Sequence, residues 1–521
     1  MYVVSAAQMR RIESHAFADY GIPSILLMEN AAFAVVQEIC KHAAGLERES
    51  ASWRVSVVVG KGNNGGDGMA VARLLSMRGM DVTVLILAQP ADFRGDALIN
   101  FRLLQETKCK LFVIEGEKHL RLLRLALSQA DVIVDAIYGI GLRGALPNLI
   151  AECVKEINAA AAWVVAVDIP SGLEADRGIV RHEAVRADQT VTFGWPKLGH
   201  LLARGPEYCG ALTVDPISIP DKYLMDEELN VEVLTERGMR ALLPQRSFQG
   251  HKGTHGRGIL AAGSTGMSGA ALLAGRGALR AGAGLLQMVV PQGIAAAVDA
   301  GLTEATVWPA PGEDSLTEDA WPVIEERCRG AQALAVGPGL KQDPALRVLL
   351  EHILEKVTLP LVLDADALNV IAVEPDLLQL RRGRGPLILT PHPGEMARLC
   401  GISTREVQAN RLDLAVSKAI DWEATVVLKG AITIIAAPDG QAFLNPTGNP
   451  GLGTGGTGDV LTGSILGWLA QGVAPLEAAC LSVYLHGLAA DDLARSCGFS
   501  GYTASEVADR LPEVREKLRT Q

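Results

Sequence analysis

Apolar runs of strand length alternate with segments of helical spacing along most of the chain, in two successive series. The runs of the first series lie at 54–59, 82–87, 132–137, 164–167 and 190–193, with helical spacing between them at 69–77, 97–105, 120–127 and 149–157. The second series has runs at 259–262, 286–290, 333–336, 361–363, 387–389, 425–428 and 433–436. Strands that alternate with helices predict a parallel sheet flanked by helices. We therefore expect an α/β protein with two three-layer domains.

The length of the chain and one break in the pattern indicate where the domains meet. At 521 residues the chain exceeds what one hydrophobic core usually supports. The alternation stops between Val214 and Val231, where two prolines are followed by the acidic residues Asp226, Glu227 and Glu228. Such a stretch is typical of a linker. We place one domain at residues 1–220 and the other at 228–521.

The composition excludes several classes of protein. Hydrophobic residues make up 49% of the chain and charged residues 21%, as in ordinary globular proteins. A net charge of −11 argues against nucleic acid or an anionic membrane as the partner. The eight cysteines form no C-x-x-C pair, and no apolar run approaches the length of a membrane span. We expect a cytoplasmic protein without disulfides or zinc.

Polar residues follow the strands of the first series at the points where the strands end. Residues 61–68, Lys-Gly-Asn-Asn-Gly-Gly-Asp-Gly, form a predicted loop before the first of these helices, while Asp135, Asp168 and Ser171 lie at later strand ends. The carboxyl ends of parallel strands converge on one crevice. Oxygen ligands from Asn64, Asp135 and Ser171 suit a hard alkali or alkaline-earth cation. Each of them, taken alone, is equally well explained as a capping or turn residue.

A second glycine loop, Gly-Asn-Pro-Gly-Leu-Gly-Thr-Gly-Gly-Thr-Gly-Asp at 448–459, precedes an apolar helical run. Its glycines let successive backbone N–H groups point at one ligand, beside the positive end of the following helix. We interpret the loop as a phosphate cradle. Because an acid is repulsive at a simple anion site, Asp459 is expected to handle a proton or a metal ion there. The alternative is a flexible loop whose aspartate caps the helix.

Other strand ends of the second series carry further polar residues. They are Gly339, the pair Asp364 and Asp366, His392 between two prolines, and Lys429. A histidine on a stiff turn favours a ligand contact. Lys429 is interpreted as a phosphate contact or as a solvated lysine, and the aspartate pair as a magnesium site or as helix caps.

The motifs of the first series together resemble the NAD(P)H-hydrate epimerase family, the N-terminal part of YjeF-type proteins, over about residues 5–220. The resemblance implies a Rossmann-like fold and interconversion of the R and S forms of hydrated NADH and NADPH, called NADHX and NADPHX. It implies a potassium ion held by Asn64, Asp135 and Ser171. Either Asp67 or Asp168 would give and take the proton of the reaction. The substrate would be lined by Asn63, Asn64, Gly65, Gly66, Asp67, Gly139, Ile140, Gly141, Leu142, Arg143, Gly144, Ala145 and Asp168.

The second series resembles the ribokinase-like superfamily and, within it, the NAD(P)H-hydrate dehydratase family, over about residues 233–518. The matching motifs are His-Pro-Gly-Glu at 392–395, Lys-Gly-Ala at 429–431 and the glycine loop with its aspartate. The resemblance implies that the S hydrate is dehydrated at the expense of ADP or ATP with Mg²⁺, through a phosphorylated hydroxyl, with Asp459 as the base. The substrate would contact Ala283, Gly339, His392 and Asp459. The nucleotide would contact Lys429, Gly430, Ala431, Ile432, Thr433, Asn449, Gly453, Gly455, Gly456, Thr457 and Gly458.

We therefore expect a bifunctional repair enzyme, and two alternatives stay open. One is that the second domain is a kinase for a sugar or a hydroxymethylpyrimidine, and the other is that the first domain binds nucleotides without turnover. On the resemblance alone, ADP is preferred to ATP as phosphoryl donor. A glycine- and alanine-rich helix at 275–284 predicts close helix packing, which also permits a homo-oligomer.

Overall fold

The computed structural model describes residues 1–46, 53–224, 228–246 and 248–520. The chain divides into two compact units, an N-terminal unit of Tyr2–Leu229 and a C-terminal unit of Asn230–Gln521 that also includes Met1. The division lies within the stretch expected to be the linker, of which Asp226 and Glu227 fall outside the described residues. No helix among the described residues combines the length and the apolar character that a membrane span requires.

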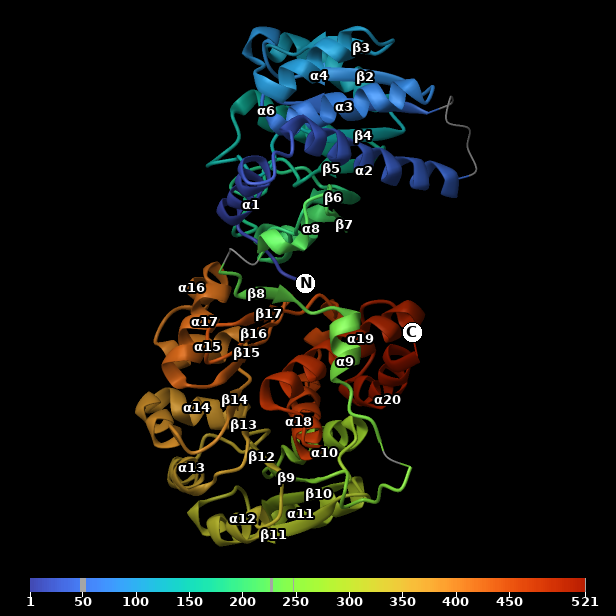
Figure 1. The fold of residues 1–521 in the computed structure, drawn as a ribbon. Coiled ribbons are helices and arrows are strands. Elements are labelled where there is room, and N and C mark those ends of the chain that lie inside the picture. Colours follow the sequence, from blue (N-terminus) through green and yellow to red (C-terminus); the bar gives the residue numbers. More distant parts are fainter. Residues whose placement is uncertain (47–52, 225–227, 247, 521) are drawn as a thin grey trace. The chain divides into compact units, whose positions relative to one another are not determined.

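The described part of the N-terminal unit contains one sheet of seven parallel strands in the order β3-β2-β1-β4-β5-β6-β7 (Figure 1). They are β1 (Arg54–Val59), β2 (Asp81–Ile86), β3 (Lys110–Val113), β4 (Val132–Ala136), β5 (Trp163–Val167), β6 (Gln189–Phe193) and β7 (Ala211–Asp215). All five expected strands are confirmed to within one residue at each end. The edge strands β3 and β7 were not expected. Thr213 interrupts the apolar residues of β7, and the apolar part of β3, Leu111 to Val113, is short and only partly buried.

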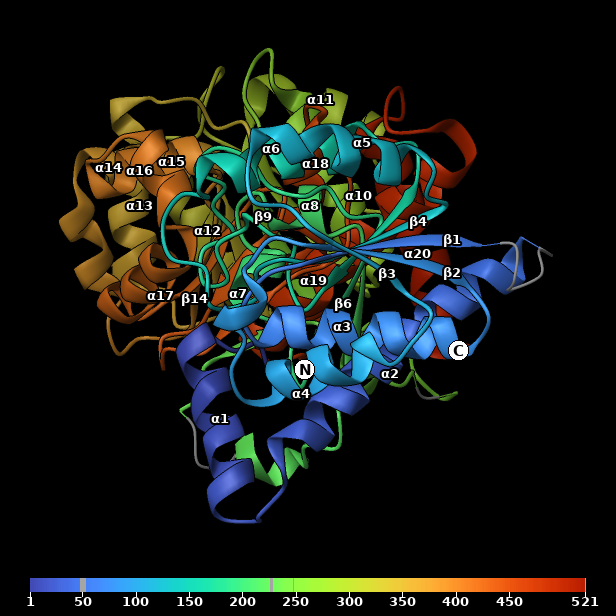
Figure 2. The same cartoon turned by 90° about the horizontal axis from the view of Figure 1, so that it is seen from above.

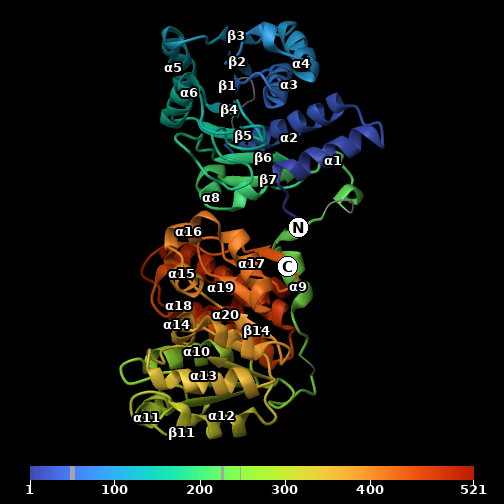
Figure 3. The ribbon, with the colours of Figure 1, turned by 90° about the vertical axis from the view of Figure 1, so that its left-hand side faces the viewer.

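Helices cover both faces of this sheet. They are α1 (Ala6–Ala18), α2 (Ser24–Gly45), α3 (Asn63–Met77), α4 (Gly95–Gln105), α5 (Leu120–Ser128), α6 (Asn148–Ala159), α7 (Leu198–Leu201) and α8 (Gly205–Cys209). Figures 2 and 3 show α2, α3 and α4 on one face and α5 and α6 on the other. Neighbouring residues of a strand point to opposite faces. Val57 and Val59 therefore pack into the core beneath α2, α3 and α4, while Val58 packs into the core beneath α5 and α6.

Residues Asn63–Gly68, expected as a loop, instead form the first turns of α3. Glycine disfavours helix, which is why the sequence predicts a loop here. The tertiary reason for glycine is close packing, since a Cβ on Gly68 would lie 2.4 Å from the Cβ of Ala136 in the sheet. The helix therefore begins directly against the carboxyl ends of the strands, with Asn64 and Asp67 in its first turns.

The C-terminal unit has a ten-stranded mixed sheet within the described residues, in the order β11-β10-β9-β12-β13-β14-β15-β16-β17-β8. The strands are β8 (Val231–Val233), β9 (Arg257–Ala261), β10 (Leu285–Pro291), β11 (Thr306–Ala310), β12 (Ala333–Val336), β13 (Leu361–Leu363), β14 (Leu387–Leu389), β15 (Thr425–Leu428), β16 (Ile434–Ala436) and β17 (Ala442–Leu444). The seven expected strands are confirmed, whereas β8, β11 and β17 were not expected. The five residues between β15 and β16 are too few for a crossover, so this pair is antiparallel.

Two helical layers flank this second sheet. The helices are α9 (Glu236–Leu242), α10 (Ser268–Ala281), α11 (Gln292–Gly301), α12 (Trp321–Cys328), α13 (Pro344–Lys356), α14 (Ala365–Val373), α15 (Pro393–Cys400), α16 (Thr404–Ala409), α17 (Arg411–Trp422), α18 (Thr457–Ala470), α19 (Pro475–Cys497) and α20 (Ala504–Thr520). One core joins α10, α18, α19 and α20 to the sheet, and a second joins α12, α13 and α14 to its other face.

Helices α10 and α18 lie side by side and approach closely (Figure 1). A Cβ on Gly463 would lie 1.8 Å from the carbonyl oxygen of Ala274, and one on Gly277 would lie 2.4 Å from that of Val460. The prediction of close packing is confirmed. Gly277 and Ala274 of α10 therefore pack against α18 within the unit.

Candidate active sites

The carboxyl edge of each sheet collects most of the expected site residues. In the N-terminal unit the strand order reverses between β1 and β4. Asn64 and Asp168 follow β1 and β5, and Asp135 is the penultimate residue of β4. In the C-terminal unit the order reverses between β9 and β12, and Gly339, His392 and Lys429 follow β12, β14 and β15. Such reversals open a crevice for ligands.

A buried ion pair fixes Asp168. Its Oδ1 accepts hydrogen bonds from the Nζ of Lys197 at 2.6 Å and from the hydroxyl of Thr192 at 3.0 Å. Burial by itself raises the pKa of Asp168, but the charge and hydrogen bond of Lys197 outweigh it, so the pKa lies below its ordinary value. The backbone of Asp168 has a φ of 65°, a left-handed conformation that is costly for a non-glycine residue and aims this carboxylate. Lys197 was not predicted, although its place shortly after a strand end was a usable signal.

Asp67 lies in a different electrostatic environment from Asp168. Burial, followed by the negative charges of Asp168 and Glu13, raises the pKa of Asp67 well above its ordinary value. Burial also raises the pKa of Glu13 in α1, and the nearby Lys197 offsets part of this rise. The pKa of Asp67 is therefore raised and that of Asp168 lowered, so Asp67 holds its proton more tightly than Asp168 does.

The expected cation ligands lie at adjoining strand ends. The carboxylate of Asp135 is fully buried and accepts hydrogen bonds from the backbone N–H of Ser171 at 2.7 Å and from its hydroxyl at 2.6 Å. Burial raises the pKa of Asp135 to about 6. Both polar atoms of the buried Asn64 amide lack a hydrogen-bond partner. A Cβ on Gly139 would lie 3.1 Å from Asn64 Oδ1 and equally far from Asp168 Oδ2, so these two oxygens converge on the same point.

The segment from Gly139 to Ala145 forms an open wall of the crevice. Ile140 is held from α1, because Arg10 donates a hydrogen bond to its carbonyl oxygen at 2.7 Å. Gly141, Arg143, Gly144 and Ala145 are exposed. The segment is thus fixed next to Asn64 and Asp168 at one end and accessible to a ligand at the other.

In the C-terminal unit, Asp459 lies in the first turn of α18 among several charges. Burial and then the negative charge of Asp364 raise the pKa of Asp459 to about 7, while Lys429 opposes the rise. The Nζ of Lys429 donates a hydrogen bond to Asp364 at 2.8 Å and lies 3.8 Å from Glu395. The other oxygen of Asp364 accepts from the hydroxyl of Thr462 at 2.7 Å. Neither Thr462 nor a role for Glu395 was predicted, although Glu395 is the last residue of the His-Pro-Gly-Glu motif.

The glycine loop ends where α18 begins, at Thr457. Gly456 has a φ of 91°, which requires glycine, and a Cβ on exposed Gly453 or Gly455 would meet no atom within 4 Å. Thr457 ties the loop together by donating to the carbonyl oxygens of Leu452 and Thr454. The polar atoms of Asn449 are engaged inside the protein, with Asp491, Tyr502 and the N–H of Gly451. In this structure the Asn449 side chain therefore holds the loop.

His392 has a structural role that the sequence did not predict. Its Nδ1 accepts hydrogen bonds from the backbone N–H groups of Gly394 and Glu395, so it caps α15. Burial and then the positive charge of Lys429 lower the pKa of His392. The ring is half exposed, and its Nε2 lies 3.4 Å from Glu395. The capping leaves this Nε2 edge as the part that is able to contact a ligand.

Ala283 does not join the other predicted substrate residues, and its assignment is corrected here. It lies between the end of α10 and the start of β10, at the amino edge of the sheet, opposite the edge of Gly339 and His392. The residue beside Gly339 is Ala270 in the first turn of α10, whose Cβ would lie 2.9 Å from a Cβ on Gly339. The usable signal was that Ala270 follows the strand run at 259–262, whereas Ala283 precedes the next one.

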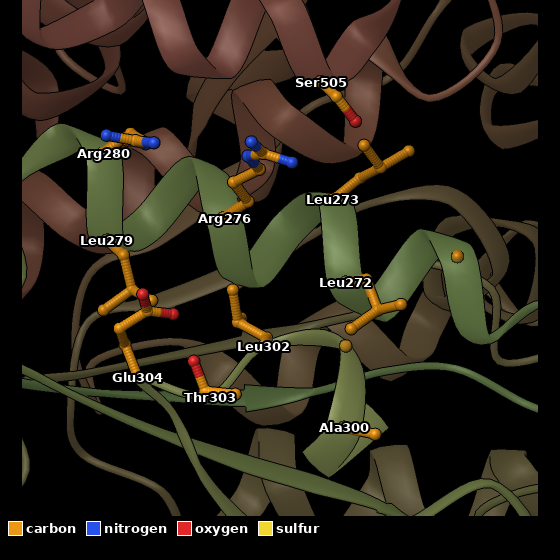
Figure 4. A pocket seen from close by; sticks show the side chains of 12 residues that line it. Leu272, Leu273, Arg276, Leu279, Arg280, Ala300, Leu302, Thr303, Glu304 and Ser505 are labelled. Carbon is orange, nitrogen blue, oxygen red and sulfur yellow. The ribbon is translucent and has the colours of Figure 1, made fainter. Parts of the chain in front are cut away.

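A groove of about 910 Å³ lies elsewhere on the C-terminal unit (Figure 4). Leu272, Leu273 and Arg276 of α10 line it together with Leu302 and Ser505. It contains none of the predicted site residues.

Comparisons with known proteins match both units. A family model described as NAD(P)H-hydrate dehydratase matches residues 259–513, and one described as YjeF-related protein N-terminus matches residues 24–199. A crystal structure of the ADP/ATP-dependent NAD(P)H-hydrate dehydratase of Bacillus subtilis, co-crystallised with ATP and Mg²⁺, is 38% identical with a TM-score of 0.48, covering 56% of this chain and 99% of that chain.

Full-length relatives extend the match over the whole chain. The bifunctional NAD(P)H-hydrate repair enzyme Nnr of Moorella thermoacetica is 45% identical, over 100% of this chain and 98% of its own length. That of Escherichia coli is 35% identical over 98% of this chain and 94% of its own. Both units, in the same order, are therefore shared with these proteins. The chain belongs to the family of bifunctional NAD(P)H-hydrate repair enzymes.

Proposed function

We propose that residues 1–220 epimerise R- and S-NAD(P)HX and that residues 228–521 dehydrate the S form at the expense of ADP or ATP. The observation that carries the proposal is the pairing, in each unit, of a carboxyl group of raised pKa with a lysine–aspartate ion pair at the carboxyl edge of a sheet. Full-length relatives favour this function over the kinase alternative, because they share both units. The eight unpaired cysteines suit the reducing cytoplasm.

In the epimerase unit, Asp67 is the proposed acid and base. Its retained proton is available to the C6 hydroxyl as the C6–O bond breaks, which leaves a cationic ring and one water molecule. The ionised Asp168, held by Lys197, stabilises that positive charge without accepting the proton. Water then adds to either face and returns its proton to Asp67. Asp67 is therefore the better choice of the two aspartates that the sequence left open.

The unpartnered amide of Asn64 supports a cation site in the same crevice. Among the described residues, Asn64 Oδ1 is a buried acceptor without a donor, and hydrogen bonds from Ser171 and Ile137 are what oppose the rise in the pKa of the buried Asp135. These oxygens, with Ser171, fit a weakly hydrated monovalent ion, and we propose potassium. When bound, the ion supplies positive charge for the substrate's phosphates and orders the Asn64 amide.

In the dehydratase unit, Asp459 is the proposed base. It takes the proton of the C6 hydroxyl as that oxygen attacks the terminal phosphorus of the nucleotide, and AMP or ADP leaves. The N–H groups at the start of α18 bind the transferring phosphoryl group. Lys429 adds its charge there, since its Nζ would lie 3.4 Å from a Cβ on Gly458 in the first turn of α18. The ring nitrogen then expels phosphate from C6, and loss of a C5 proton yields NAD(P)H.

No group of three or more His, Cys, Asp or Glu side chains among the described residues is placed to hold a metal ion directly, so we propose that magnesium enters with the nucleotide and contacts the acidic residues around Lys429 through water. Asp364, Asp366, Glu395 and Asp459 contribute to one local electrostatic environment, in which Lys429 is the cation that acts on Asp459. Carboxylate oxygens with bound water are what Mg²⁺ prefers. When bound, the ion would neutralise charge on the nucleotide phosphates.

One assay tests both activities. The full chain is incubated with a mixture of R and S hydrate, with ADP, with ATP or with neither, and the return of the reduced nicotinamide absorbance is followed. We expect full recovery with a nucleotide and none without. Asp67→Asn should stop recovery at the S fraction, and Asp459→Asn should abolish it. Recovery of neither form with either nucleotide would refute the repair function.

A further inference from the structure

Arg411, the first residue of α17, lies beneath the turn that joins β15 to β16. Its Nη2 donates hydrogen bonds to the carbonyl oxygens of Leu428 at 3.1 Å, Lys429 at 3.2 Å and Ile432 at 2.8 Å. Its Nη1 donates a further hydrogen bond to the carbonyl oxygen of Lys429, also at 3.2 Å. One guanidinium therefore holds both arms of the turn at 429–433, the segment proposed to bind the nucleotide.

Gly430 leaves space for this guanidinium. A Cβ at that position would lie 2.5 Å from both Nη atoms of Arg411, so any other residue would displace it. The glycine of the Lys-Gly-Ala motif is thus explained by the arginine beneath it together with a φ of 157°, a conformation that other residues rarely adopt. Nothing in the sequence linked Arg411 to this motif.

The same hydrogen bonds orient the backbone of the turn. The described chain contains no cis peptide bond, and a trans peptide group points its N–H opposite to its C=O. With the carbonyl groups of Lys429 and Ile432 directed at Arg411, the N–H groups of Gly430 and Thr433 point away from it. Convergent backbone N–H groups bind anions and other acceptors.

The charge of Arg411 is also unusual. Its guanidinium is partly buried, it donates hydrogen bonds to carbonyl oxygens and to the amide oxygen of Gln408, and burial lowers its pKa to about 10. It is still charged at neutral pH. A buried cation with neutral partners favours an anionic ligand above it.

We propose that Arg411 is a positioning residue for the nucleotide, which acts by holding the turn at 429–433 with its N–H groups toward the ligand. The inference rests on the proposed nucleotide role of this turn. It adds a residue outside the recognised motifs, and it predicts a defect in nucleotide binding that leaves the hydrate site intact.

The test is steady-state kinetics of the full chain with Arg411→Lys. A lysine keeps the charge but lacks the planar fork that reaches both arms of the turn. We expect the KM for ADP or ATP to rise about tenfold or more, and the KM for the S hydrate to change less than about threefold. Epimerisation by the other unit should stay at the wild-type rate, which verifies the amount of intact enzyme.

Arg381 provides a matched control. It is also a buried arginine whose guanidinium donates to three carbonyl oxygens, those of Val357, Leu359 and Pro386, but these lie at the amino edge of the sheet. Arg381→Lys should lower thermal stability and leave the nucleotide KM unchanged. An equal rise in nucleotide KM for both variants would overturn the proposal, because it would indicate general loosening.

A second variant keeps the test decisive if Arg411→Lys fails to fold. Gly430→Ala displaces the guanidinium and should raise the nucleotide KM in the same way, and the double variant should be no worse than the poorer single variant. If the wild type turns over and neither variant changes the nucleotide KM beyond about twofold, the role of Arg411 is refuted while the proposed function stands. If the wild type shows no nucleotide-dependent dehydration, the proposed function itself fails.

Discussion

The pH dependence of dehydration should report the ionisation of Asp459. Burial and the charge of Asp364 raise the pKa of Asp459 to about 7, and the reaction needs the ionised form as base. At a pKa of 7, about a tenth of the molecules carry the ionised form at pH 6 and about nine tenths at pH 8. The value of kcat/KM for the S hydrate should therefore rise about tenfold between these pH values, because the rate follows the ionised fraction.

The assay uses saturating Mg²⁺ and nucleotide, so that titration of the free nucleotide does not contribute. Asp366→Asn is the informative variant, because Asp366 is one of the negative charges that raise the pKa of Asp459. Its amide oxygen is still able to accept the N–H of Lys341, which Asp366 now accepts at 2.9 Å. We expect the rise in kcat/KM to move to lower pH in this variant. A profile that is flat or falls between pH 6 and 8, with chemistry rate-limiting, would show that Asp459 is not the base.

Three further results are expected. Potassium should accelerate epimerisation by the wild type and not by Asn64→Leu, which removes the unpartnered amide, and an equal response in a potassium titration would contradict the site. Gly463→Ala, with its Cβ 1.8 Å from the Ala274 carbonyl oxygen, should destabilise the C-terminal unit by about 1–3 kcal/mol in a thermal scan. Gly269→Ala is the control, since its Cβ meets no atom within 4 Å and alanine favours helix. Lys197→Met should cost the N-terminal unit about 3–5 kcal/mol in urea unfolding at pH 7, because it leaves the Asp168 carboxylate buried and unpaired. In the wild type the pKa of Asp168 is lower in the folded state, so this stability is present above the unfolded pKa of about 4 and is lost as the pH falls through the folded pKa. If the Lys197→Met variant unfolds like the wild type at pH 7, this account of the ion pair is refuted.

Central strands were predictable because both of their faces are buried. Runs such as 164–167 and 333–336 are apolar throughout, and the structure places strands at these residues. Edge strands such as β7 and β8 were not predictable, because their partly exposed or very short runs give no such signal. Residues Asn63–Gly68 were expected as a loop because glycine propensity is local, whereas the helix there is stabilised by packing on the sheet.

The candidate sites, like the strands, were predictable from the sequence only in part. Strand ends, glycine loops and motif residues such as Lys429 and Asp459 follow from order along the chain, since parallel strands bring their carboxyl ends together. The sequence by itself determined the fold class, the two sets of polar residues and the family resemblance. Only the tertiary structure decided that the pKa of Asp67 is raised while that of Asp168 is lowered, that His392 caps a helix and that Arg411 holds the turn at 429–433. The reason is physical: pKa values and hydrogen-bond partners depend on burial and on charges from distant segments, which neighbours in the sequence do not specify.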